Sequence, residues 1–222
     1  MSWFVIAVDG PAASGKGTIA TMLGRHFGLP VLDTGLLYRA VGVTLARQGG
    51  DLSDEQAAAQ VARRLNPRCL ADPAFRAAGS GEAASRVAEH PAVREALLAL
   101  QRGFAVQAGG AVIDGRDIGT VIAPDAPAKL YVTASAAERA RRRWRQLGAA
   151  GEATSYEDVL ADIERRDERD AARADAPMRP AEDAVLLDTT EMSISAAADA
   201  ARRIVEAARA TWETTPQGTS PG

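Results

Sequence analysis

The sequence predicts an α/β fold with three layers, in which helices cover both faces of a five-stranded parallel sheet. Two observations favour this fold. Short, continuous apolar runs alternate with helical patterns along most of the chain, as in strands joined by crossover helices. In addition, a glycine-rich segment that ends in a lysine lies between the first apolar run and the first helical pattern.

Five segments have the composition of strands that are buried on both faces, because each is short, apolar and uninterrupted. The expected strands are residues 3–8, 31–33, 111–114, 129–133 and 184–188. Asp9, Asp33 and Asp114 stand at the ends of three of these runs. Ligands of parallel sheets bind beyond the carboxyl ends of the strands, so we expect the three aspartates to gather at a functional edge.

The helical segments have recognisable start and stop signals. Gly28 and Pro30 end the first helix, Pro91 suits a first helical turn, and Ser135 is expected to cap a very basic helix. The expected helices are residues 18–27, 35–47, a helix starting at 53, 82–89, 91–107, 135–147, 155–172 and 195–210.

A length of 222 residues fits one domain with small insertions. Residues 1–50 and 91–213 are expected to form the core, and residues 51–90, which contain several helix breakers, an insertion outside the sheet. Glycines within residues 148–151 separate two charged helices and predict a mobile helical lid over about residues 139–172. Residues 214–222 are rich in Pro, Gly, Ser and Thr and are expected to be disordered.

Composition excludes several classes of protein. The net charge of −3 gives no global attraction to nucleic acid or to an anionic membrane. The single cysteine, Cys69, allows neither an internal disulfide nor a cysteine-built zinc site. No apolar run approaches the roughly 20 residues of a membrane-spanning helix. We therefore expect a cytoplasmic monomer without nucleic-acid or membrane partners.

The glycine-rich segment matches the phosphate-binding pattern G-x-x-x-x-G-K, and only two of the chain's residues are lysines. Glycines let the backbone curl around an anion, and the N–H groups at a helix start point toward it. Lys16 adds a full positive charge at the β- and γ-phosphates. The expected ATP-binding residues are Gly10, Pro11, Ala12, Ala13, Ser14, Gly15, Lys16, Gly17 and Thr18.

One position departs from the general pattern, which places Ser or Thr after the lysine to hold Mg²⁺. Gly17 occupies that position here, and Thr18 follows it. This Gly-Lys-Gly-Thr form resembles that of nucleoside-monophosphate kinases. We expect Mg²⁺ to be the cofactor and to be held through carboxylates such as Asp114, directly or through water.

Arginines supply the other candidate phosphate ligands. Arg139, Arg142 and Arg143 are spaced i, i+3, i+4 and share a helix face, as Arg166 and Arg173 do with Asp170 between them. Fixed cations of this kind stabilise the charge of a phosphoryl transition state. Spacing alone leaves a second interpretation open, in which both helices are solvated and held by intrahelical ion pairs.

Several ordered blocks together resemble the bacterial cytidylate kinase family, from the first strand to the last helix. The blocks are residues 9–11, 14–18, 32–35, 38–39, 84–85, 87–88, 93–98, 114–117, 119–121, 164–167, 169–170 and 173. The resemblance implies a P-loop NTPase-type fold. It also implies transfer of the γ-phosphate of ATP to CMP or dCMP, giving CDP or dCDP and ADP, by Mg²⁺-assisted in-line attack.

The resemblance also implies roles for individual residues. Arg94 and Asp117, with Ser85, would bind cytosine, whose amine is a donor and whose ring atoms are acceptors. The implied CMP-binding residues are Asp33, Thr34, Arg39, Ser85, Arg94, Arg116, Asp117, Arg166, Asp170 and Arg173. The implied catalytic residues are Lys16, Arg116, Arg139, Arg142, Arg143 and Arg169.

Two other functions remain open at this point. The first is a P-loop kinase for a different nucleotide or a metabolite. The second is a nucleic-acid-binding module that uses the basic run at residues 139–145. The acidic net charge and the lack of interleaved aromatic residues disfavour the second function. The single asparagine, Asn66, excludes the N-K-x-D string of guanine-specific switches.

Overall fold

A computed structural model describes residues 3–77 and 79–215 of the chain. Its sheet has five parallel strands in the order β2-β3-β1-β4-β5, which confirms the predicted fold class. The strands are β1 (Val5–Asp9), β2 (Val31–Asp33), β3 (Ala111–Gly115), β4 (Ala128–Thr133) and β5 (Val185–Asp188). Each corresponds to a predicted strand, with differences of one or two residues at the ends.

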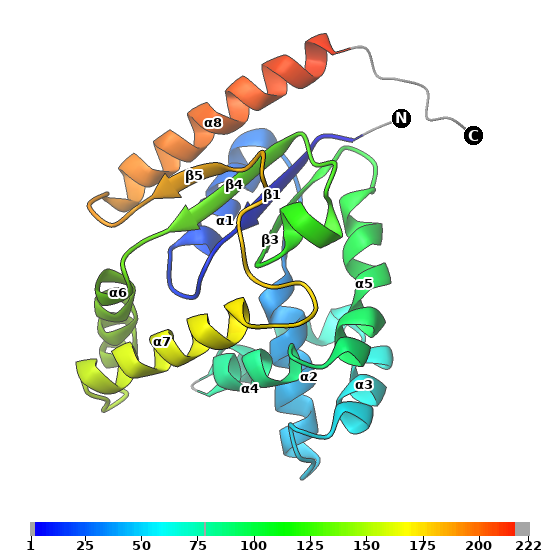
Figure 1. The fold of residues 1–222 in the computed structure, drawn as a ribbon, viewed down its shortest axis with the longest axis vertical. Helices are drawn as coiled ribbons and strands as arrows, with labels where there is room; N and C mark the ends of the chain where they lie inside the picture. Colours follow the sequence, from blue (N-terminus) through cyan, green and yellow to red (C-terminus); the bar gives the residue numbers. More distant parts are fainter. Residues whose placement is uncertain (1–2, 78, 216–222) are drawn as a thin grey trace.

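The central strand β1 is buried on both faces, which explains its unbroken apolar sequence. Ile6 and Val8 belong to a core cluster shared with α1 (Lys16–Phe27) and α8 (Ile194–Thr214). The alternate residues Val5 and Ala7 belong to a second cluster, which α5 (Pro91–Ala105) helps to cover. Helices therefore pack on both faces, and Figure 1 shows α8 lying along β4 and β5.

Residues 51–90, the predicted insertion, belong to a separate helical unit. Its helices are α2 (Thr34–Arg47), α3 (Glu55–Arg63), α4 (Ser80–Val87) and the first part of α5, and their apolar faces form one cluster away from the sheet. Two short 3₁₀ helices that the sequence did not predict, η1 (Pro67–Ala71) and η2 (Pro73–Arg76), lie between α3 and α4. Residues 51–90 thus pack on α2 and α5, and these two helices position them beside the sheet edge.

Two further helices, α6 (Ala136–Ala149) and α7 (Tyr156–Ala171), lie beyond the carboxyl ends of the strands (Figure 1). Ser135 caps α6 as predicted, because its hydroxyl accepts a hydrogen bond from the backbone N–H of Glu138. Ala140, Val159 and Ile163 form the apolar contact between the two helices, and Ala13 of the glycine-rich segment packs against them. The lid boundary at about residues 139–172 stays a prediction.

Several predicted helix ends differ from the structure by two to four residues, and two of them fall where a break was expected. Helix α6 continues through Ala149 and so contains Gly148, which was expected to break it. Helix α8 continues through Thr214, the residue at which the disordered tail was expected to begin. Residues 216–222 of that expected tail lie outside the described residues. None of the described helices is long and apolar enough to cross a membrane.

Candidate active site

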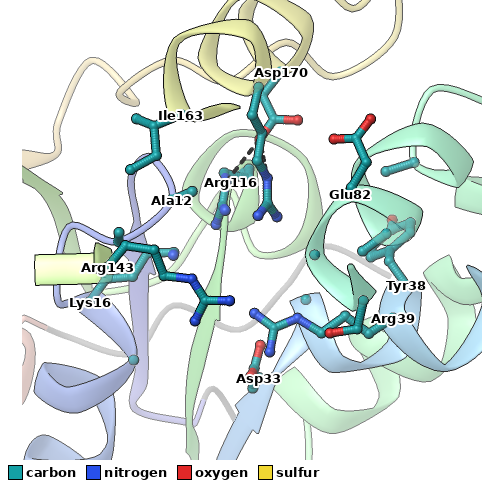
Figure 2. Close-up of a pocket in the computed structure, with 18 of the residues that line it drawn as sticks. Ala12, Lys16, Asp33, Tyr38, Arg39, Glu82, Arg116, Arg143, Ile163 and Asp170 are labelled. Carbon is teal, nitrogen blue, oxygen red and sulfur yellow. Dashed lines mark hydrogen bonds and ion pairs between the residues drawn. The ribbon is translucent and has the colours of Figure 1, made fainter. Parts of the chain in front are cut away.

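A cavity of about 590 Å³ lies at the carboxyl edge of the sheet. Its walls come from the glycine-rich segment, the starts of α1 and α2, the end of β3, and helices α4, α6 and α7. In Figure 2 the guanidinium groups of Arg39 and Arg143 point toward each other from opposite sides of this space. The cavity therefore joins all the segments in which candidate residues were predicted.

The three strand-end aspartates gather at this edge, as predicted. Asp33 and Asp114 are register partners in β2 and β3, and Asp9 is the partner of Gly115. The three aspartates differ in burial and in hydrogen bonding. Asp33 caps α2 by accepting from the N–H of Leu36 at 3.2 Å, whereas Asp9 and Asp114 are almost fully buried.

The glycine-rich segment has the backbone of an anion nest. Gly10, Ala13 and Gly15 have φ angles of 144°, 60° and 90°, so the chain curls tightly before α1 begins at Lys16. A β-carbon on Gly10 would lie 2.0 Å from the carbonyl oxygen of Val132, so only glycine fits there. The start of α1 has neither an acidic residue in its first turn nor a side-chain cap. Its N–H groups and its dipole remain available to a phosphate.

Lys16 supplies a buried positive charge beside this nest. Its ammonium donates to the carbonyl of Pro11 at 3.4 Å and lies 3.8 Å from Oδ1 of Asp114. Burial and the charge of Arg116 lower the pKa of Lys16 to about 8, although Asp114 acts in the opposite direction. The ammonium is thus only partly balanced by protein groups, and an anionic ligand would favour its charged form.

The structure explains why glycine follows the lysine. A β-carbon on Gly17 would lie only 3.1 Å from Oδ2 of Asp114, so this carboxylate occupies the space beside the residue. The other oxygen, Oδ1, is buried without a hydrogen-bond partner. Burial raises the pKa of Asp114, and Lys16 opposes that effect. A carboxylate therefore stands near the position at which the general motif has a hydroxyl.

A group of three arginines, Arg116, Arg166 and Arg173, surrounds one buried acid at the far side of the cavity. Asp170, which is 1% exposed, accepts from Nε of Arg116 at 3.2 Å and also pairs with Arg173. Burial alone would raise the pKa of Asp170, but the neighbouring arginines hold it below its usual value. Figure 2 shows Arg116 directly beside Asp170.

This arginine group carries more positive charge than Asp170 balances. Burial and the charge of Arg116 lower the pKa of Arg166 to about 10. The Nε atoms of Arg39, Arg166 and Arg173 are buried without a hydrogen-bond partner. Such donors are well suited to a phosphate, which accepts several charge-assisted hydrogen bonds.

The pair predicted to recognise cytosine is present at the cavity wall. Arg94 and Asp117 are each 6% exposed and form an ion pair with one another. Nε of Arg94 lies 3.4 Å from a carboxylate oxygen of Asp175, on the loop after α7. Ser85 does not line the cavity, because its hydroxyl donates to Asp170 at 3.1 Å. The structure therefore brings Arg94 and Asp117 to the cavity, whereas Ser85 contacts Asp170 and is not part of the lining.

The three candidate arginines of α6, Arg139, Arg142 and Arg143, differ in what they contact, although they share a helix. Only Arg143 lines the cavity. Arg139 is 5% exposed, pairs with Asp167 of α7 at 2.6 Å and donates to the carbonyl of Ala12 at 3.2 Å. Arg142 donates to the carbonyl of Ser14 at 3.4 Å. Two of the three arginines thus support the glycine-rich segment through its carbonyl groups.

Arg169, another expected catalytic residue, does not line the cavity. Its guanidinium pairs with Glu82 at 2.9 Å and with Glu89 at 3.0 Å, so it connects α7 to α4. The cavity lining also includes residues that the sequence analysis did not name as site residues, among them Tyr38 and Arg76. Helical spacing from Thr34 to Tyr38 was a usable signal, because residues i and i+4 share a face. No comparable signal marks Arg76.

Comparison with known proteins gives a consistent result. The family model for cytidylate kinase matches residues 6–208. The chain belongs to the cytidylate kinase family. A cytidylate kinase of Caulobacter sp. (strain K31) is 63% identical over 209 residues, covering 94% of this chain and 97% of the relative. One of Xanthobacter autotrophicus is 60% identical over 206 residues, covering 93% and 99%.

Membership of this family makes the chain an enzyme, a nucleotide-binding phosphotransferase of the kinase type. The matches extend over nearly the whole of both chains, so residues 51–90 and helices α6 and α7 belong to the shared region. A solved structure of an uncharacterized protein from Eubacterium ventriosum has a TM-score of 0.57 at 13% identity, covering 93% of this chain and 99% of that one. That likeness concerns the fold alone.

Proposed function

We propose that this cytidylate kinase family member transfers the γ-phosphate of ATP to CMP or dCMP, giving ADP and CDP or dCDP. One observation carries the proposal. A single cavity has an anion nest with Lys16 at one side, an arginine group around Asp170 at the other, and the pair Arg94–Asp117 in its wall. Donor phosphates, acceptor phosphate and acceptor base each have chemically matched residues.

On the donor side, the ammonium of Lys16 and the backbone N–H groups within residues 10–18, of which Pro11 has none, bind the β- and γ-phosphates. Arg143 faces the same space from the lid. Arg139 and Arg142 contribute indirectly, because they hold carbonyl groups of the nest from the outer side. We therefore assign Arg143 a direct role and the other two a positioning role.

On the acceptor side, Arg39, Arg166 and Arg173 bind the phosphate of CMP through donors that protein groups leave unused. Arg116 lies between the two sides, since its charge acts on both Lys16 and Asp170. Fixed charges around a transferring phosphoryl group stabilise its equatorial oxygens without any covalent intermediate. Direct in-line transfer is therefore the mechanism that suits this arrangement.

The base site favours cytosine over uracil. Asp117 is an acceptor for the exocyclic amine of cytosine, and Arg94 is a donor for its ring acceptors. Uracil presents an oxygen in place of that amine and a ring N–H in place of an acceptor. Both groups would meet the wrong partner in a buried site, which is energetically costly. CMP and dCMP are thus the expected acceptors.

The residues present also fit Mg²⁺. Oδ1 of Asp114 is a buried carboxylate oxygen without a hydrogen-bond partner, at the edge where the phosphates bind. Mg²⁺ prefers one or two carboxylates together with substrate phosphates and water. Within the described residues no group of three or more His, Cys, Asp or Glu side chains could hold a metal without substrate. Bound in this way, the ion would neutralise charge on the β- and γ-phosphates.

We expect Asp114→Asn to raise the Mg²⁺ concentration required for half-maximal rate about tenfold, because an amide oxygen binds Mg²⁺ less well than a carboxylate. The measurement is the initial rate over a Mg²⁺ titration at constant free ATP. Asp54→Asn, which changes a carboxylate that caps α3, is the matched control and leaves the titration unchanged. Identical titrations for wild type and Asp114→Asn would remove Asp114 from the metal site.

A substrate panel tests the function itself. ADP formation is measured with ATP and Mg²⁺ and with CMP, dCMP, UMP, AMP or shikimate as the acceptor, and chelation of the metal serves as the blank. We expect CMP and dCMP to be the best acceptors. Preference for AMP or shikimate would identify a different small-molecule kinase. We also propose a cytoplasmic monomer, which size-exclusion chromatography and cell fractionation would test.

The nucleic-acid-binding alternative loses its main support in the structure. Arg139 is buried in its contacts with Asp167 and Ala12, and Arg142 turns toward Ser14. The basic run therefore does not present a continuous charged surface. A gel-shift titration with single-stranded RNA and with duplex DNA, at low salt, is expected to show no complex.

A further inference from the structure

The segment that carries Arg116 and Asp117 is held by a residue from another strand. Both carboxylate oxygens of Asp9, at the end of β1, accept hydrogen bonds from consecutive backbone N–H groups. Oδ1 accepts from Ile118 and Oδ2 accepts from Gly119, each at 2.8 Å. These two residues begin the π-helical turn η3 (Ile118–Ile122), which follows directly on Asp117.

The first N–H groups of a helical turn normally donate such hydrogen bonds to the side chain of the residue that precedes the turn. Asp117 has a suitable side chain and the N-terminal position, yet it makes no capping hydrogen bond. Its carboxylate is directed instead to Arg94 at the cavity wall. Asp9 supplies the missing cap from β1 and thereby leaves the side chain of Asp117 free for the ligand.

The support on which Asp9 stands is rigid. Asp9 is 4% exposed and lies between register partners on both sides, Gly115 in β3 and Tyr131 in β4. The next residue, Gly10, approaches Val132 so closely that no β-carbon fits. The Asp9 carboxylate therefore ties the turn directly to the strand that leads into the anion nest.

We propose that Asp9 is a positioning residue of the acceptor site, which caps η3 from β1 so that Asp117 can engage the base of CMP at a fixed place relative to the ATP-binding segment. The inference rests on the proposed base-recognition role of Arg94 and Asp117. It gives Asp9 no contact with substrate or metal, because both of its oxygens are occupied by backbone N–H groups.

Asp9→Asn is the first test. The amide keeps one accepting oxygen and turns an N–H group toward the other backbone N–H, so one of the two hydrogen bonds is lost. We expect KM for CMP to rise about tenfold, the CMP-to-UMP preference to fall, and KM for ATP to stay within about twofold. Assays at about pH 8 keep the wild-type carboxylate ionised, because burial raises the pKa of Asp9 to about 7 despite its N–H partners.

Gly119→Ala is a second variant, in case Asp9→Asn does not fold. Its β-carbon would lie 3.2 Å from Cδ of Lys129, so the turn or that side chain must give by a few tenths of an ångström, and 3.4 Å from Oδ2 of Asp9, directly beside the cap. A smaller rise in KM for CMP, about threefold, is expected, again without a change for ATP. Asp54→Asn is the control for loss of a cap elsewhere, and both KM values stay unchanged in it.

The outcomes separate this inference from the proposed function. If Asp117→Asn weakens CMP while Asp9→Asn and Gly119→Ala leave KM for CMP unchanged, or change both KM values equally, Asp9 is a structural cap only and the inference is wrong. If Asp117→Asn itself leaves CMP binding and the CMP-to-UMP preference unchanged, the base-recognition role fails, and this inference fails with it. Selective weakening of CMP in all three variants supports both.

Discussion

Lys16→Ala is expected to lower kcat about 10³- to 10⁵-fold while the protein stays folded. The ammonium lines the cavity beside the anion nest, and removal of one fixed cation from a phosphoryl-transfer site has effects of this size. The free energy of unfolding should fall only slightly, because the lost protein contacts are one 3.4 Å hydrogen bond and a 3.8 Å ion pair. Asp114, left without its cation, has a pKa that burial raises and can take up a proton.

The measurement is single-turnover and steady-state kinetics with ATP and CMP, together with circular dichroism and a thermal melt. Lys16→Arg keeps the charge but changes its shape and is expected to recover part of the rate. Arg202→Ala removes a positive charge from the exposed face of α8, where it pairs with Glu206, and leaves kcat unchanged. Wild-type turnover in folded Lys16→Ala would refute the assignment of the phosphate-binding segment.

Arg94→Met is expected to raise KM for CMP roughly 100-fold and KM for ATP by less than about threefold, because charged hydrogen bonds to the base are lost only on the acceptor side. The substitution also leaves Asp117 buried without its partner. Breaking a buried ion pair from one side typically costs about 3–5 kcal/mol of stability. With this variant alone, a loss of stability cannot be distinguished from a loss of CMP binding.

A double variant separates the two effects. Arg94→Met with Asp117→Asn removes both charges of the pair, so its thermal stability should lie above that of Arg94→Met alone. CMP binding, measured by calorimetry at a temperature at which both variants are folded, stays weak in both. Equal losses of affinity for ATP and CMP would contradict the base-recognition role of Arg94.

The strands were predictable because their burial is recorded locally in the sequence. A strand such as β1, covered on both faces, needs an unbroken apolar run, and the strand-end aspartates follow from the same pattern. The start of α4 was missed for a tertiary reason. Gly81 looks like a loop residue, but it lies inside the helix where a β-carbon would come 2.9 Å from Nη1 of Arg166. The glycine serves this close approach between elements distant in the sequence.

At the site, too, some features were predictable from local sequence and others depend on tertiary contacts. Spacing placed Arg166, Asp170 and Arg173 on one helix face, and the structure brings all three to the cavity. Equally regular spacing could not separate Arg143 from Arg139 and Arg142. Their difference depends on partners such as Ala12 and Ser14, which lie more than a hundred residues away in the chain. Local periodicity reports which residues share a face but not what that face meets.

The strand order has a consequence for how the chain is made. The strand of this sheet that is synthesised first is also its middle strand, and its neighbours are residues 111–115 and 128–133. During synthesis this apolar segment and the glycine-rich segment after it lack their neighbouring strands until residues 111–133 have emerged from the ribosome. Nascent chains shorter than that should therefore be unable to retain nucleotide, and should depend on chaperones to keep the segment from aggregating.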